Sequence, residues 1–91
     1  MVDKLIRKPI SDKAIRDATD SVIHKIIERL AKKGRGSFAS VHEVWGAVDE
    51  EMQEFKDAVR ENDLPAAERE LRDIAVGAIF AIACIMDEGI K

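Results

Sequence analysis

The chain has 91 residues, of which 46% are hydrophobic and 36% are charged, and its formal net charge is −3 at pH 7. This balance indicates one soluble domain, because the chain is too charged for a membrane protein and too apolar for a disordered one. The mild acidity argues against a protein that binds a nucleic acid polymer through phosphate contacts, although local basic groups can still hold a small anion.

Neither export nor membrane insertion is indicated. The longest uninterrupted apolar run, residues 74–86, has thirteen residues, whereas about 20 are needed to span a bilayer. Residues 1–10 carry three basic side chains but no apolar core of a signal peptide. The single cysteine, Cys84, lies in the apolar run and is expected to be a small buried hydrophobe. We expect a cytoplasmic protein.

The pattern predicts an all-α fold with an extended tail over residues 1–10 and a single domain over residues 11–91. The first helix follows Pro9, with Ser11 or Asp12 as its N-cap, and ends at Gly34. Its apolar residues recur at helical spacing. They are Ile15, Val22, Ile26 and Leu30.

The second helix begins at a capping box. Ser40 and Glu43 stand three residues apart, so that each side chain can accept from the other residue's backbone amide. An apolar stripe follows along one face of this helix, which is typical of a helix that faces a core. Its members are Val41, Val44, Trp45, Val48, Met52, Phe55 and Val59.

A short turn joins the second helix to a third. Asp63 can cap the third helix, and Pro65 is tolerated in its first turn. A connection of about two to five residues between helices makes an antiparallel hairpin. The expected architecture is therefore a helical hairpin preceded by an N-terminal helix.

The third helix is amphipathic as far as Asp73 and then apolar on every face over residues 74–86. Such a helix must be covered all round, and two short helices can hardly do so. A second subunit is therefore expected to pack on it, as in a homo-oligomeric four-helix bundle. Gly77 costs about 1 kcal/mol relative to alanine inside a helix, which indicates close approach of a helix or a ligand.

Two carboxylate pairs stand at i, i+3 spacing, Glu51 with Glu54 and Glu70 with Asp73. Each pair lies on one helix face, and an antiparallel hairpin brings the two pairs together. Four negative charges at one place are unfavourable unless cations bind or protons are taken up. Oxygen ligands alone favour a hard ion, Mg²⁺, with Mn²⁺ as an in vitro substitute.

Other readings of these acids stay open. A carboxylate-bridged iron protein wants Glu-x-x-His on two helices, and the only histidines are His24 and His42. Zinc is disfavoured for the same reason. A chain with 18 acids also places two of them at i, i+3 spacing by chance, and neighbouring bases such as Arg69 and Lys56 would then give a solvated, salt-bridged face.

Together the acids read Glu50-Glu51-Met52-Gln53-Glu54 and then Glu70-Leu71-Arg72-Asp73. This arrangement resembles the E-E-x-x-E and E-x-x-D signature of the MazG-like, all-α nucleoside triphosphate pyrophosphohydrolases. The resemblance covers about residues 37–86. It implies a helical bundle assembled as a homodimer or homotetramer, with Mg²⁺ held by the acids. It also implies cleavage of an NTP or dNTP between the α and β phosphates to a monophosphate and pyrophosphate, as in nucleotide house-cleaning.

Carried onto this chain, the resemblance makes Glu51, Glu54, Glu70 and Asp73 metal ligands. Glu50 would position a ligand or the attacking water, and a carboxylate, for which we take Glu54, would accept the water's proton. Metal ions supply charge neutralisation of the triphosphate and acidify a bound water. Because little follows Met86, a partner subunit would have to complete the pocket.

Candidates for substrate contact are chosen by position alone. The basic ones are Lys25, Arg29, Lys32 and Arg72. Trp45 could stack on a base, although it falls inside the apolar stripe and core packing is the competing explanation. His42 could touch a nucleotide, although an exposed, uninvolved histidine is common in a first helical turn. The alternative function is a non-catalytic helical interaction module of the same fold.

Overall fold

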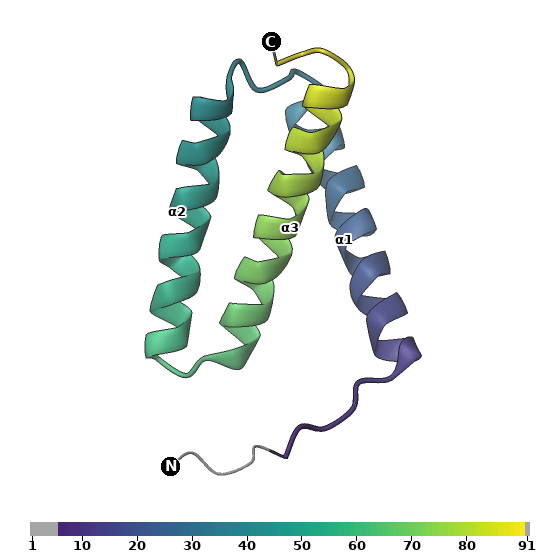
Figure 1. Ribbon diagram of the computed structural model, residues 1–91, viewed down its shortest axis with the longest axis vertical. Helices are drawn as coiled ribbons and strands as arrows, with labels where there is room; N and C mark the ends of the chain where they lie inside the picture. The colour runs from purple at the N-terminus through teal and green to yellow at the C-terminus, as the bar shows by residue number, and fades with distance from the viewer. Residues whose placement is uncertain (1–5, 91) are drawn as a thin grey trace.

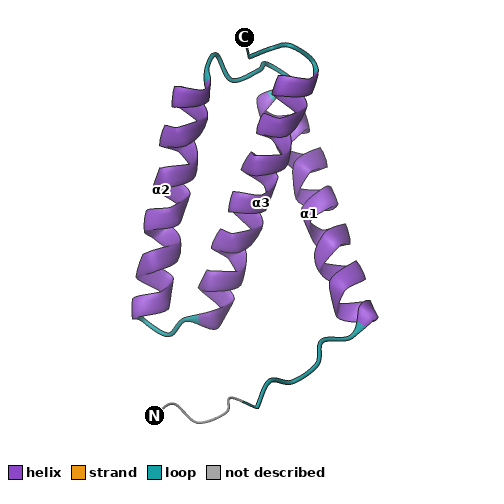
Figure 2. Cartoon of the chain, in the orientation of Figure 1, coloured by secondary structure: helices purple, strands orange, loops and turns teal. Residues whose placement is uncertain are grey.

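The protein consists of three α-helices, as the sequence predicts. The computed structural model describes residues 6–90, in which α1 spans Asp12–Lys33, α2 spans Val41–Arg60 and α3 spans Leu64–Met86. In Figure 1, α3 lies between the other two helices, and Figure 2 shows the loops that join them. The tail expected over residues 1–10 has no helix or strand over residues 6–10, while residues 1–5, like residue 91, lie outside the described part.

Each helix begins at the predicted cap. The Oγ atom of Ser11 accepts from the Ala14 amide at 3.0 Å, and the Oδ1 atom of Asp63 accepts from the Ala66 amide at 3.0 Å. These side chains satisfy backbone donors that have no partner inside the helix.

The capping box of α2 is formed, but one partner differs from the prediction. The Oγ atom of Ser40 accepts from the Glu43 amide at 3.2 Å, as expected. The Oε1 atom of Glu43 accepts from the Ala39 amide at 2.7 Å, and not from that of Ser40. Both amides precede the first helical turn, so the carboxylate still satisfies an orphan donor while it holds the incoming loop one residue earlier.

The helix ends use left-handed backbone where the chain must turn. Gly34 has φ +78°, and its amide donates to the Leu30 carbonyl at 2.9 Å. Between α2 and α3, Asn62 has φ +54°, a conformation that asparagine tolerates. The Asp63 amide donates to the Ala58 carbonyl at 3.0 Å. The turn is thus closed by hydrogen bonds, and the predicted antiparallel hairpin is confirmed (Figure 1).

Helix α3 is the centre of the packing. Within residues 6–90 it packs against both α1 and α2, whereas α1 and α2 are not packed against each other. The buried apolar residues are small ones, which allows the helix axes to approach. They are Ala58, Val76, Ala81 and Cys84. The expectation that Cys84 is buried is confirmed.

Much of the apolar surface remains exposed in the single chain. Trp45 is 75% exposed, so the expectation that it packs in a core is wrong for this chain. The reason is geometric, because α3 alone covers α2 and reaches only part of the apolar stripe. On α3 itself Ile79, Ile82 and Ile85 stay about half exposed. The chain therefore does not cover the apolar part of α3 all round.

Two further observations complete the fold. After α3, the chain returns to the loop before α2, where a Cβ atom on Gly89 would collide with Ser37, so this approach requires glycine. None of the helices in residues 6–90 combines the length and apolar character needed to cross a membrane.

Candidate metal centre

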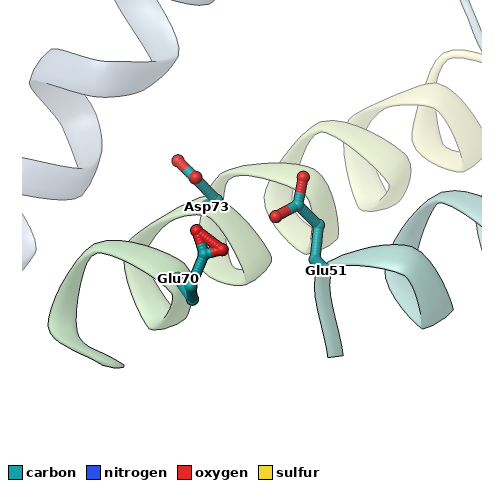
Figure 3. Close-up of side chains that lie close together, drawn as sticks. All are labelled: Glu51, Glu70 and Asp73. Carbon is teal, nitrogen blue, oxygen red and sulfur yellow. The ribbon is translucent and has the colours of Figure 1, made fainter. Parts of the chain in front are cut away.

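Three carboxylates meet where α2 faces α3. Glu51 reaches out from α2, and Glu70 and Asp73 come from successive turns of α3 (Figure 3). One oxygen from each lies within 4.8 Å of the others, and all three side chains are half-buried. We call these residues the acidic triad. The predicted convergence of the two carboxylate pairs is thus confirmed for three of the four acids.

The hairpin explains why the triad forms. Glu70 and Asp73 are three residues apart and share a helix face, and the short turn holds that face against α2. Ala58, one of the buried residues of this interface, keeps the two helices close. The carboxylates are consequently held near one another by the backbone.

The triad lacks donors. The Oε2 atoms of Glu51 and Glu70 are buried, and no hydrogen-bond partner is found for either one in the described chain. An ionised carboxylate only accepts hydrogen bonds, so neighbouring carboxylates cannot satisfy each other. A buried polar atom without a partner costs about 1–3 kcal/mol. The site therefore needs a cation or a proton.

The pKa of Glu51 shows the same need. It is raised from 4.5 to about 7, first because burial penalises the charged form, and then because Glu54, Asp73 and Glu70 repel a further negative charge. A hydrogen bond from protonated Glu51 to Glu54 adds to the effect. Near neutral pH, Glu51 thus holds a proton part of the time when no cation is present.

Glu70 behaves similarly. Its pKa is raised chiefly because protonated Glu70 can share a hydrogen bond with Glu54. Burial and the charges of Glu54 and Asp73 raise it further, whereas Arg69 lowers it. Glu54 is therefore close to two members of the triad, although its own side chain is exposed and does not join the group of converging oxygens.

The residues present fit a hard divalent cation. All the converging donors are carboxylate oxygens, and in residues 6–90 no histidine or cysteine is among them. Such a donor set suits Mg²⁺, Ca²⁺ or Mn²⁺ better than zinc. A cation would supply partners for the two orphaned Oε2 atoms and offset the mutual repulsion of the acids. The structure supports a possible metal site at the triad.

A cleft of about 480 Å³ opens beside the triad, between α1 and the α2–α3 hairpin. Its lining is divided by charge. Glu51 and Asp73 belong to one wall, and the other wall is a run of basic residues on α1, which we call the basic wall. The basic wall comprises Lys25, Arg29, Lys32 and Lys33.

Two residues of the basic wall are held by contacts to α3. The Nζ atom of Lys25 lies 3.3 Å from the Oδ1 atom of Asp73. The guanidinium of Arg29 lies over the ring of Phe80, with its central carbon 4.1 Å from the ring centroid, and also near Phe38 at 5.9 Å. These contacts fix two positive groups at the edge of the cleft.

The structure does not bring every predicted site residue to this cleft. Glu50, His42 and Trp45 are exposed and do not line it. Arg72 does not line it either, because its Nε atom donates to the Ser21 Oγ atom at 3.0 Å and a terminal nitrogen donates to Glu68 at 2.7 Å. Arg72 thus ties α1 to α3, and its expected place beside the substrate is not supported.

Three residues of the cleft were not predicted from the sequence, namely Lys33, Phe38 and Phe80. Helical spacing offered a signal for one of them. Phe80 follows Asp73 by seven residues, two turns along the same face of α3. Phe38 lies in a loop, where no periodicity places a side chain.

Comparison of the chain with protein-family models, with curated proteins and with solved structures finds no match. The site is therefore interpreted from its own geometry and from the acidic signature in the sequence.

Proposed function

We propose that this protein is a Mg²⁺-dependent nucleotide pyrophosphohydrolase that cleaves an NTP or dNTP between its α and β phosphates. The observation that carries the proposal is the acidic triad, whose converging oxygens form one wall of a cleft with a basic opposite wall. A metal chelated by a phosphate chain carries both charges that such a cleft needs. The resemblance of the acidic signature to the MazG-like enzymes supports the same reaction.

In this proposal Glu51, Glu70 and Asp73 hold the cation, and Glu54 is either a fourth ligand or the acceptor of the water's proton. Bound Mg²⁺ supplies Lewis-acid chemistry, neutralising phosphate oxygens and acidifying water. Glu54 suits proton acceptance because its exposed carboxylate lies beside the triad and reaches solvent. A role for Glu50 in positioning water stays a prediction, as do contacts of His42 and Trp45 with a nucleotide.

The test is pyrophosphate release from a panel of NTPs and dNTPs with Mg²⁺, with Mn²⁺ and with a chelator. Release that requires the metal and falls by at least about 100-fold in Glu54→Gln is expected, because general acid–base groups contribute about 100-fold or more. Asp49→Asn is a matched control, since Asp49 is exposed on the same helix and outside the cleft. No release from any nucleotide by the unmodified chain would refute the proposal.

We further propose that the protein works as a homodimer or homotetramer in the cytoplasm. The support is the exposed apolar surface, which includes Trp45 on α2 and Ile82 and Ile85 on α3. Such side chains gather at interfaces between subunits. Sedimentation velocity should give a mass of at least two chains, and Ile82→Glu should shift it toward one. A monomeric mass at all concentrations would contradict this.

The same surface favours the second candidate, a non-catalytic helical interaction module. A module without a site should bind neither Mn²⁺ nor a non-hydrolysable nucleotide in calorimetry. Binding of both by the unmodified chain would exclude this alternative.

A further inference from the structure

Arg29 is a positive group held in place by aromatic rings. Its guanidinium stacks on Phe80 of α3 at 4.1 Å and approaches Phe38 at 5.9 Å, and the two rings meet edge to face with centroids 5.7 Å apart. The arginine side chain is half-buried and lines the cleft. Cation–π contacts of this kind restrict a side chain that would otherwise have many rotamers.

The charge of Arg29 is not balanced by a neighbour. Among residues 6–90, no carboxylate oxygen lies within ion-pair distance of its guanidinium, whereas Lys25 is paired with Asp73 and Arg72 with Glu68. Because a ring covers the flat face of the guanidinium, its N–H donors, which lie in the plane, stay available at the edge. A fixed guanidinium with free donors is the arrangement that binds phosphate oxygens in a bidentate way.

Two more positive groups stand beside it. Lys32 and Lys33 line the same cleft, and Lys32 follows Arg29 by three residues, which places it one turn along the same face of α1. The acidic triad lies on the other wall. A ligand that fills this cleft must therefore present negative charge to α1 while its other end accompanies a cation.

We propose that Arg29 and Lys32 form a subsite for the phosphate chain, in which they hold the β and γ phosphates that leave as pyrophosphate. This inference rests on the proposed function and assigns which residues select for a polyphosphate over a monophosphate. It also means that inorganic tripolyphosphate, which has no base or sugar, binds the protein through this subsite. The aromatic rings of Phe38 and Phe80 act as positioning groups for Arg29.

The test is calorimetric titration of the full chain with inorganic tripolyphosphate in the presence of a chelator, so that the triad carries no metal. Arg29→Gln should weaken binding by about tenfold or more, the scale of one hydrogen-bonded charge pair. Arg29→Lys, which keeps the charge but loses the fork of donors, should lose less. Arg16→Gln is the matched control, because Arg16 is exposed on the same helix and does not line the cleft.

Binding of Mn²⁺ reports separately on the triad, and it should be unchanged in Arg29→Gln. If the loss of ring contacts unfolds that variant, Lys32→Met serves instead, since Lys32 is exposed and is expected to give about a threefold loss. Equal affinity for tripolyphosphate in the unmodified chain and in these variants would overturn the subsite. So would an equal loss in Arg16→Gln, which would mean unspecific attraction.

The subsite and the proposed reaction can fail independently. Arg29-dependent binding of tripolyphosphate by a chain that releases no pyrophosphate from any nucleotide would leave the subsite standing and refute the hydrolase. Pyrophosphate release that is the same in Arg29→Gln as in the unmodified chain would refute the subsite and leave the hydrolase.

Discussion

The two walls of the cleft treat charge in opposite ways. On the hairpin wall, Glu51 and Glu70 each have a buried oxygen without a partner, and their pKa values are raised. On the basic wall, Arg29 is held by aromatic rings and not by an acid. The hairpin wall is thus strained by like charges until a cation arrives, whereas the basic wall is already ordered for an anion.

Only one ion pair crosses between the walls within the described residues, from Lys25 on α1 to Asp73 on α3. The difference teaches that the two walls are not mutual partners and that charge is left over on both. A site built only for stability would pair these groups directly, because unpaired half-buried charges cost free energy. The leftover charge is the physical mark of a binding site.

Removing one acid of the triad should have the largest effect. Glu70→Gln is expected to weaken Mn²⁺ binding by about 100-fold, the scale of losing one charged ligand worth about 3 kcal/mol. Calorimetry with the metal alone measures this without any substrate. Asp49→Asn is the control, because Asp49 is exposed and outside the cleft. Equal affinity in Glu70→Gln and the unmodified chain would mean that the triad holds no metal.

The stability of the metal-free chain should fall as the pH rises. The pKa of Glu51 is about 7 in the folded chain and 4.5 without the surrounding fold, so between these values the folded chain holds more protons than the unfolded one. The stabilisation from this proton is complete below about pH 4.5 and is lost as the pH rises through about 7. We expect a loss of about 1–3 kcal/mol in the free energy of unfolding between about pH 5 and pH 8.

Urea unfolding at several pH values measures this slope. Glu51→Gln should flatten it, because glutamine does not titrate, and Mg²⁺ at about pH 8 should restore the lost stability by binding the folded chain. A metal-free chain that becomes more stable over this range, with the same slope in Glu51→Gln, would contradict the prediction.

Local signals in the sequence were sufficient for the helices. Ser40, Asp63 and Gly34 mark helix ends through bonds to atoms three or four residues away, so that no tertiary information is needed. The hairpin follows from the short turn alone. The position of α1 does not follow from local signals, since nothing in its periodicity says that it packs against α3 and leaves α2 free.

The same limit explains the errors at the site. Spacing placed four acids together, but it did not fix how α2 is rotated about its axis, and Glu54 lies just outside the converging group. Trp45 fell within the predicted stripe, yet its part of α2 has no second helix to cover it. Arg29 was a candidate by position, but the rings that hold it come from a loop and from the far half of α3.

A smaller effect is expected on the hairpin wall at Gly77. This glycine lines the cleft, and a Cβ atom there would meet nothing within 4 Å in the chain. Gly77→Ala should therefore stabilise the chain by about 0.5–1 kcal/mol through helix propensity. Gly46→Ala, which is also open, is the matched control. Thermal unfolding in which Gly77→Ala alone destabilises the protein would show that a second copy packs against this turn of α3.

The smallest effect should come from the ion pair between the walls. The Lys25 ammonium lies 3.3 Å from Asp73 and already neutralises part of the charge of the triad. Lys25→Met removes this charge while it keeps the apolar stem, so Mn²⁺ should bind about threefold more tightly, in keeping with about 0.2–1 kcal/mol for a partly exposed pair. Lys13→Met is the control, because Lys13 is paired with Asp17 on the exposed start of α1. Weaker Mn²⁺ binding in Lys25→Met would mean that Lys25 orients Asp73 for the metal, in which case the two walls depend on each other and their charges are not left over.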